Sequence, residues 1–177
     1  MTDEALIQST LDGDDRAFAE LVARHKGKVF GIASRFADGS HQLDDMAQEI
    51  FVRAWRNLRK FRGDAPFEHW LSRIAVHTCY DFLRKKQRTP DSVPLDERDG
   101  EIPANTGSRA SEARETLDFA MRRLSPEERL VITLTALEEK SVSEVAALTG
   151  WSEANVKVRN FRARQALKKI LETTHER

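Results

Sequence analysis

The sequence predicts an all-α protein made of two small helical domains joined by a flexible linker. Apolar residues recur at helical spacing in both halves of the chain, and no segment shows the alternation typical of strands. The 177 residues are 40% hydrophobic and 33% charged, which suits a largely helical chain with packed cores. Residues 87–112 contain prolines, glycines and excess acids, and they lack apolar periodicity. We therefore expect helical domains at 1–86 and 113–177 and an acidic linker at 87–112.

Three helices are expected in the first domain. The first starts at Asp14 or Asp15, with an irregularity near Gly27, and the second runs over 43–58. Pro66 suits the first turn of the third, which ends in the basic run 84–86. The apolar faces of the three helices comprise Phe18, Leu21, Val22, Val29, Ile32 and Phe36; Leu43, Met46, Ala47, Ile50, Phe51, Ala54 and Leu58; and Phe67, Trp70, Leu71, Ile74, Cys79 and Phe82.

The second domain is expected to be a four-helix unit. Its first helix carries an apolar stripe of Leu117, Ala120, Met121 and Leu124. Ser125 precedes a proline and two glutamates, a strong start for the second helix, whose face then buries Leu130, Val131 and Leu134. A helix-turn-helix completes the domain.

The helix-turn-helix occupies residues 141–171. Ser141 and Glu144 have the capping-box spacing, Gly150 supplies a left-handed stop, and Ser152 can cap the helix that follows. That helix places Val156, Ala163, Leu167 and Leu171 on one side. Between residues 157 and 169 it has no acidic residue and carries the cations Lys157, Arg159, Arg162, Arg164, Lys168 and Lys169. Such a helix fits the major groove of DNA, where its cations neutralise phosphates. The alternative interpretation is a helical hairpin whose basic side faces water.

Composition excludes several other classes of protein. No apolar run approaches the ~20 residues that span a bilayer, and the acidic N-terminus lacks the pattern of a secretory signal, so we expect a cytoplasmic protein without membrane insertion. The single cysteine, Cys79, excludes an internal disulfide and a cysteine-built zinc site, and its place on an apolar face indicates a buried structural thiol. The five histidines are scattered, and the paired acids stand at helix starts. We expect no metal site, no cofactor and no catalysis by this chain alone.

Motifs in both domains resemble one family. Residues 45–55 (DMAQEIFVRAW), 61–63 (FRG) and 70–75 (WLSRIA) look like region 2 of a bacterial RNA polymerase sigma factor. Residues 124–129 (LSPEER), 156–159 (VKVR) and 161–164 (FRAR) are similar to region 4. A short linker in place of a large middle domain resembles the extracytoplasmic-function (ECF) group.

The resemblance implies a detachable specificity subunit of RNA polymerase. Its partners would be the β′ and β subunits of the polymerase core, promoter DNA and an anti-sigma factor that holds it inactive. The neutral net charge, from 29 basic and 29 acidic residues, agrees with DNA binding that needs help from a partner. The acidic linker resembles the segment that follows the RNA exit path of polymerase, although ordinary solubility explains its composition equally well.

The resemblance assigns the outer face of helix 43–58 to a coiled coil of the β′ subunit. The residues concerned are Asp45, Gln48, Glu49, Val52, Trp55 and Arg56. An exposed Val52 beside Trp55 fits an apolar interface core with a polar rim, whereas the bland alternative is a solvated face.

The loop 61–65 resembles the segment that captures an unstacked base of the promoter −10 element. The −10 candidates are Asn57, Phe61, Arg62, Gly63, Asp64 and His77. His77 stands where relatives often have a small polar amide, so the resemblance does not assign the preferred base. Phe61 could instead cap the core, and core packing is the favoured role for Trp70.

The resemblance assigns the cationic helix to the promoter −35 element. The −35 candidates are Lys157, Val158, Arg159, Phe161, Arg162 and Gln165. Lys157 or Arg162 could pair with guanine edges, while Val158 and Phe161 could touch thymine methyl groups. Asn160 replaces the usual apolar residue on the inward side and so requires a hydrogen-bond partner.

Two other classes of function share some of these features. A stand-alone helix-turn-helix regulator would bind duplex DNA without polymerase. A recombinase or nuclease would need a catalytic constellation, and the sequence shows none.

Overall fold

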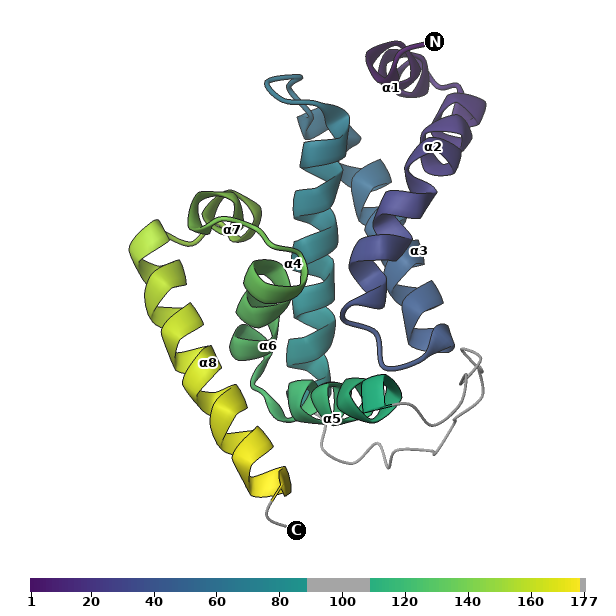
Figure 1. Ribbon diagram of the computed structural model, residues 1–177. Helices are drawn as coiled ribbons and strands as arrows, with labels where there is room; N and C mark the ends of the chain where they lie inside the picture. Colours follow the sequence, from purple (N-terminus) through teal and green to yellow (C-terminus); the bar gives the residue numbers. More distant parts are fainter. Residues whose placement is uncertain (89–108, 176–177) are drawn as a thin grey trace. The chain divides into compact units, whose positions relative to one another are not determined.

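The computed structural model describes residues 1–88 and 109–175, and the described residues form eight α-helices and no strand. The chain divides into two compact units, 1–82 and 83–177 (Figure 1). The predicted all-α class is confirmed for the described residues.

Unit 1 begins with a helix that the sequence analysis did not predict. Helix α1 (Asp3–Leu11) is capped by Thr2, whose side chain accepts a hydrogen bond from Ala5 N at 3.3 Å. It buries Leu6, Ile7 and Thr10. A threonine cap followed by two acids in the first turn is a helix-start signal, so the sequence did contain the information.

Helix α2 (Asp15–Ser34) starts as expected, with the Asp14 carboxylate accepting a hydrogen bond from Arg16 N at 3.0 Å. The predicted irregularity near Gly27 is wrong, because α2 is one continuous helix. Gly27 faces solvent, and a helix tolerates an exposed interior glycine at a cost of about 1 kcal/mol.

Helix α3 (Ser40–Asn57) continues into a 3₁₀ turn, η1 (Leu58–Lys60), and α4 (Phe67–Arg88) follows the loop 61–66. Ion pairs tie α4 to its neighbours: Lys28 of α2 meets Glu68 at 2.9 Å, and Arg53 of α3 meets Asp81 at 2.6 Å. The core between these helices is apolar, and its most deeply buried side chains include Leu21, Val29, Met46, Ile50, Leu71 and Val76.

The helices at both ends of the linker are longer than predicted. Helix α4 reaches Arg88 and α5 begins at Arg109, so residues 87–88 and 109–112 are helical. The remainder of the predicted linker, 89–108, lies outside the described residues.

Unit 2 contains α5 (Arg109–Arg123), α6 (Pro126–Ile132), α7 (Val142–Thr149) and α8 (Glu153–His175). The capping box that starts α6 is formed, with Glu128 N bonded to Ser125 Oγ at 3.3 Å and Ser125 N to Glu128 Oε2 at 2.9 Å. Helix α8 packs along α5, α6 and α7 (Figure 1). The buried core includes Ala120, Leu130, Val131, Val145, Val156 and Ala163.

A π-helical turn, η2 (Thr133–Leu137), follows α6 and was not predicted. A π-helix has more residues per turn than an α-helix, so η2 continues directly from α6 with a wider turn before the connection to α7. The connection then turns at Glu139, which has a φ of 52° in the left-handed region. Across the described residues, no helix is long and apolar enough to cross a membrane.

Candidate nucleic-acid interface and docking face

The local geometry of the helix-turn-helix is as predicted. Glu144 N bonds to Ser141 Oγ at 3.1 Å, and Ser141 N bonds to Glu144 Oε2 at 2.7 Å, which completes the capping box of α7. The hydrogen bond from the Ser141 backbone lowers the pKa of the Glu144 carboxyl. Gly150 ends α7 with a φ of 79°, and Ser152 Oγ caps α8 by accepting from Asn155 N at 3.2 Å.

The outward side of α8 exposes large apolar side chains, which are uncommon on the solvent face of a helix. Phe161 is 66% exposed and Val158 is 48% exposed, while Val156 and Ala163 on the opposite side are fully buried. Lys157, Arg162 and Gln165 also lie on the exposed side. This orientation is the one that the sequence predicted, and it places apolar groups among cations on a surface that a ligand can cover.

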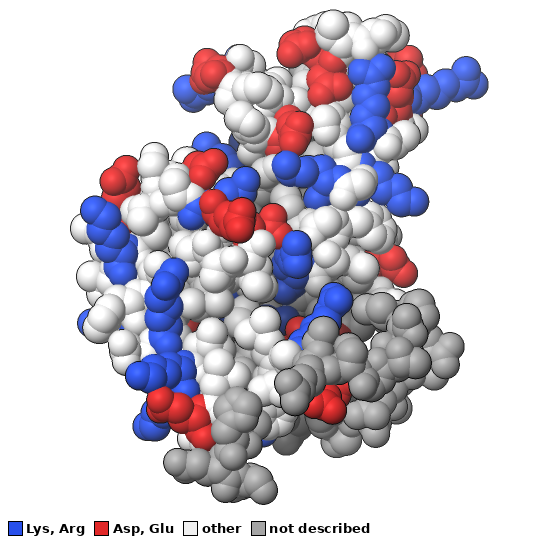
Figure 2. Space-filling view, in the orientation of Figure 1, with Lys and Arg blue, Asp and Glu red and all other residues white. Residues whose placement is uncertain are grey.

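The cations of α8 are largely uncompensated. Lys168 pairs with Glu172 at 3.8 Å, whereas the structure gives Lys157, Arg162 and Arg164 no carboxylate partner among the described residues. Lys and Arg side chains follow the length of α8 in Figure 2. A helix of this kind can neutralise phosphate charge without first breaking ion pairs of its own.

Asn160 has the partner that its inward position requires. Its side-chain amide lies 3.1 Å from the hydroxyl of Thr135 in the π-turn, and that hydroxyl also lies 2.7 Å from the carbonyl of Val131. The amide therefore ties the middle of α8 to η2.

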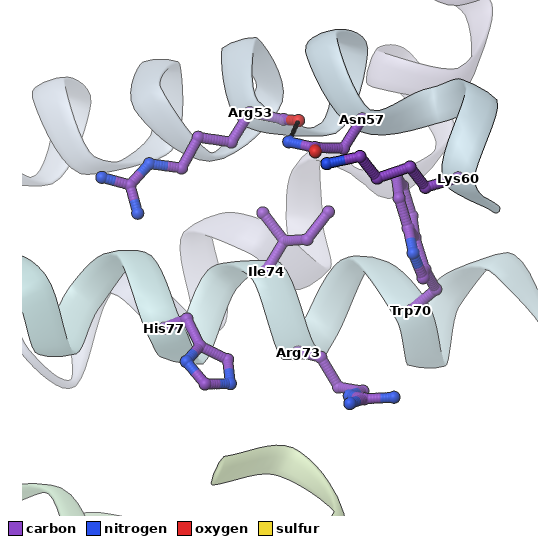
Figure 3. Close-up of a pocket in the computed structure, with 7 residues that line it drawn as sticks. All are labelled: Arg53, Asn57, Lys60, Trp70, Arg73, Ile74 and His77. Atoms are coloured by element: carbon purple, nitrogen blue, oxygen red, sulfur yellow. Dashed lines mark hydrogen bonds between the residues drawn. The ribbon is translucent and has the colours of Figure 1, made fainter. Parts of the chain in front are cut away.

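A pocket of about 340 Å³ lies between α3, η1 and α4 in unit 1 (Figure 3). Its lining consists of Arg53, Asn57, Lys60, Trp70, Arg73, Ile74 and His77. Trp70 and Ile74 point from α4 toward α3, while Arg73 and His77 point away from it (Figure 3). An indole face beside several cationic groups is suited to a nucleobase with its phosphates.

Arg53 is held in place at the pocket wall. Its Nε lies 2.7 Å from Glu49 Oε1 and its Nη1 lies 2.6 Å from Asp81 Oδ2. The hydrogen bond to Asp81, and then that to Glu49, raise the pKa of the Arg53 guanidinium. The backbone oxygen of Arg53 accepts from Asn57 Nδ2 at 2.8 Å, as the dashed line in Figure 3 marks.

The structure brings together only some of the −10 candidates. Asn57 and His77 line the pocket, whereas Arg62, Gly63 and Asp64 are exposed in the loop after η1. Phe61 is half-buried and packs edge-on against Phe67 and Trp70, with ring centroids 5.6 Å and 5.5 Å away.

Several pocket residues were missed by the sequence analysis. Arg53, Lys60, Arg73 and Ile74 were not proposed for this site, and Trp70 was expected to be a core residue. Trp70 is instead half-buried, with Phe61 and Phe67 against it and the pocket beside it. Residues 70, 73, 74 and 77 have the spacing of one helical face, which is the signal that could have grouped them.

The outer face of α3 carries the candidates for protein docking. Asp45, Gln48 and Arg56 are exposed, and Trp55 is 42% exposed. Val52 was expected to be exposed but is half-buried, so the exposed apolar group of this face is Trp55. Two of the acids already have a partner: Asp45 Oδ2 lies 3.1 Å from His41 Nδ1, and Glu49 Oε1 pairs with Arg53 Nε at 2.7 Å.

Cys79 is buried, as predicted, and burial raises the pKa of its thiol to about 12. It is therefore a packing residue and not a nucleophile. Within residues 1–88 and 109–175, no group of three or more histidine, cysteine or acidic side chains is placed to hold a metal ion.

Two helical units, of which the second contains a helix-turn-helix with a cationic second helix, are typical of DNA-binding transcription proteins. The sequence pattern of Sigma-70 region 2 matches residues 21–89, and that of Sigma-70 region 4 matches residues 114–167. The chain belongs to the ECF group of RNA polymerase sigma factors. It is accordingly a non-enzymatic transcription initiation factor, whose partners are the RNA polymerase core and promoter DNA.

Individual relatives agree along nearly their whole length. The ECF RNA polymerase sigma-E factor of Escherichia coli is 34% identical, over 94% of this chain and 93% of the relative. The RNA polymerase sigma-H factor of Pseudomonas aeruginosa is 32% identical, over 96% of this chain and 94% of the relative. Among solved structures, CnrH in complex with the cytosolic domain of CnrY is 32% identical with a TM-score of 0.60, over 97% of both chains.

Proposed function

We propose that this sigma factor reads the promoter −35 element with the outward face of α8. The observation that carries the proposal is the exposure of Phe161 (66%) and Val158 (48%) beside uncompensated cations on one helix face. Cations neutralise phosphates, apolar groups contact thymine methyl groups, and Arg or Lys pairs with guanine edges in the major groove.

The −10 element is read and melted at unit 1, by the pocket and the adjacent loop 61–65. The pocket offers the face of Trp70 for stacking and polar groups of Asn57 and His77 for a base edge. An unstacked base requires both kinds of contact, and the surrounding cations suit its phosphates. Arg62, Gly63 and Asp64 are exposed in the loop that follows Lys60 of the pocket lining.

The outer face of α3 docks on a coiled coil of the polymerase β′ subunit. An exposed aromatic residue, Trp55, surrounded by Asp45, Gln48 and Arg56 has the composition of a small interface core with a polar rim. Contacts with the β subunit complete the holoenzyme.

An anti-sigma factor holds the protein inactive until a signal releases it. The support is the ECF membership and the complex of the 32% identical CnrH with the cytosolic domain of CnrY. A partner that covers both the polymerase-docking and the DNA-binding surfaces would block initiation at two steps.

Run-off transcription with purified core polymerase and a pool of promoter fragments tests this function. We expect the chain to direct core to a subset of fragments that share a −35 and a −10 sequence. Transcription by core without the added chain, on the same pool, is the control. Gel shifts with and without core separate the proposal from its rival, because equal binding to the selected fragment without core would indicate a stand-alone regulator.

A further inference from the structure

An arginine, a tryptophan and an asparagine form one cluster at the turn of the helix-turn-helix. The guanidinium carbon of Arg159 lies over the Trp151 ring, 4.4 Å from its centroid. The Nε of Arg159 donates a hydrogen bond to Asn155 Oδ1 at 2.7 Å. The cation–π contact and the hydrogen bond together restrict the orientation of the guanidinium.

The tryptophan is itself anchored to the end of α7. Trp151 N donates to Thr149 Oγ1 at 3.2 Å, and the Thr149 hydroxyl donates to Val145 O at 2.7 Å. Gly150 between them adopts the left-handed conformation that ends α7. The ring therefore belongs to a fixed turn, and it supplies a rigid platform for Arg159.

The cluster leaves the terminal amino groups of Arg159 available. The hydrogen bond of its guanidinium to Asn155 uses the Nε–H group. The four N–H groups on Nη1 and Nη2 remain available to a ligand. No carboxylate of the described part of the chain pairs with Arg159. A planar fork held in one orientation without an acidic partner is suited to bidentate binding of a phosphate.

The position of Arg159 on α8 favours a backbone phosphate over a base. Successive helical residues are rotated by roughly 100°, so Arg159 lies about 100° from Val158 on one flank of the exposed face. Lys157 lies about 100° from Val158 on the other flank. When a helix lies in the major groove, its exposed face meets the base edges and its flanks meet the two phosphate backbones.

We propose that Trp151 and Asn155 are positioning residues that pre-organise Arg159 to clamp a backbone phosphate beside the −35 element. This assignment rests on the proposed docking of α8 in the major groove, and it adds two residues that do not themselves touch bases. The clamp fixes the register of α8 on the duplex, and the exposed face can then select sequence.

The test uses holoenzyme reconstituted from core polymerase and the full chain, on the promoter with the highest run-off yield. Kd is measured by fluorescence anisotropy at several salt concentrations for Arg159→Ala, Trp151→Leu, Trp151→Phe, Asn155→Ala and the double variant Trp151→Leu/Arg159→Ala. Lys168→Ala is the matched control, because it removes a cation of the same helix about 15 Å along the axis from Val158.

We expect Arg159→Ala to weaken binding about three- to tenfold, equally on promoters with altered −35 bases, and to reduce the salt slope by about one. Trp151→Leu and Asn155→Ala should each weaken binding by about two- to fivefold, and Trp151→Phe by less because it keeps an aromatic face. The double variant should bind no more weakly than Arg159→Ala alone. Lys168→Ala should leave Kd and slope unchanged.

Two further readouts separate a positioning role from a structural one. Replacing the clamped phosphate by a neutral methylphosphonate should weaken DNA binding by the wild type and leave the DNA binding of Arg159→Ala unchanged. Additive losses in the double variant, an unchanged salt slope for Arg159→Ala, or a loss confined to one base pair would each overturn the clamp. Failure of the wild type to bind with core would instead refute the proposed function, so the two failures are distinguishable. Asn155 is exposed, so its variant tests the clamp even if Trp151→Leu impairs folding.

Discussion

Trp55 of α3 meets Phe18 of α2 edge-on, with ring centroids 4.7 Å apart and an interplanar angle of 74°. Trp55 is 42% exposed, and its contact with Phe18 restricts the orientation of the indole. An immobilised aromatic side chain loses little entropy when a partner covers it, and such residues dominate the affinity of many interfaces. We therefore include Phe18 of α2 with the α3 residues of the proposed polymerase-docking face.

The first prediction concerns this pair. We expect Trp55→Ala to reduce affinity for core polymerase by about 2 kcal/mol, or roughly 30-fold in Kd, and Phe18→Ala to reduce it by a smaller factor. Surface-immobilised core with a titration of the chain measures both. Leu11→Ala, which truncates an exposed apolar residue of α1, is the control and should bind normally. Unchanged affinity of Trp55→Ala would remove this residue from the interface.

The second prediction concerns base recognition by Arg162. Its position on the exposed face of α8 and its lack of a carboxylate partner leave its fork available to a guanine edge. We expect Arg162→Ala to cost about 1–3 kcal/mol and to relax the preference at one base pair. Competition binding with single-base variants of the −35 element measures the preference. A uniform loss on all variants would show a phosphate contact instead.

The third prediction separates two roles of Phe61. Its ring packs on Phe67 and Trp70, so Phe61→Ala will lower the free energy of unfolding, by about 1–3 kcal/mol. We also expect it to impair promoter opening while core binding stays intact, because Phe61 packs against Trp70 of the pocket lining. Permanganate reactivity of unpaired thymines reports opening, and urea unfolding reports stability. Phe61→Leu is the control for lost packing, and equal opening by wild type and Phe61→Ala would limit Phe61 to the core.

Local signals in the sequence were sufficient for most of the fold. The capping boxes at Ser125 and Ser141 and the glycine stop at Gly150 depend on residues within four positions, so the helix limits around them were predictable. The π-turn at 133–137 depends on how α6 meets the rest of unit 2, and no local pattern encodes it. Helix α1 was missed although its threonine cap was visible.

The candidate sites were predictable to different degrees. The exposed face of α8 follows from one helix and one buried residue, Val156, so periodicity alone placed Phe161 and Arg162 outward. The pocket between α3 and α4 requires the relative rotation of two helices, which tertiary packing sets. Arg53 has Asp81, 28 residues later, as a partner, and no local pattern in the sequence indicates that contact.

The fourth prediction concerns the bond between Thr135 and Asn160. Thr135→Val removes one partner from a half-buried amide, and we expect a loss of about 1–2 kcal/mol in the free energy of unfolding. Thr135→Val combined with Asn160→Leu removes both polar groups and should recover most of that loss. Urea unfolding of the full chain, with tryptophan fluorescence, measures both variants beside the wild type. Equal instability of the single and double variants would show that the hydrogen bond does not contribute.

The fifth prediction is a pH dependence that arises at α7. The hydrogen bond from Ser141 N lowers the pKa of the Glu144 carboxyl in the folded chain below the ordinary value of 4.5. A lowered pKa means that the unfolded state binds the proton more readily, so the stabilisation is present above about pH 4.5 and is lost as the pH falls through the folded-state pKa. Glu144→Gln keeps the capping geometry without the charge, and it should therefore lose less stability than the wild type between pH 6 and pH 3.

Urea midpoints across that range measure the difference, and Glu172→Gln, at the exposed end of α8, controls for general charge removal. Parallel pH curves for wild type and Glu144→Gln would show that the capping carboxylate makes no pH-dependent contribution to the stability of the recognition motif.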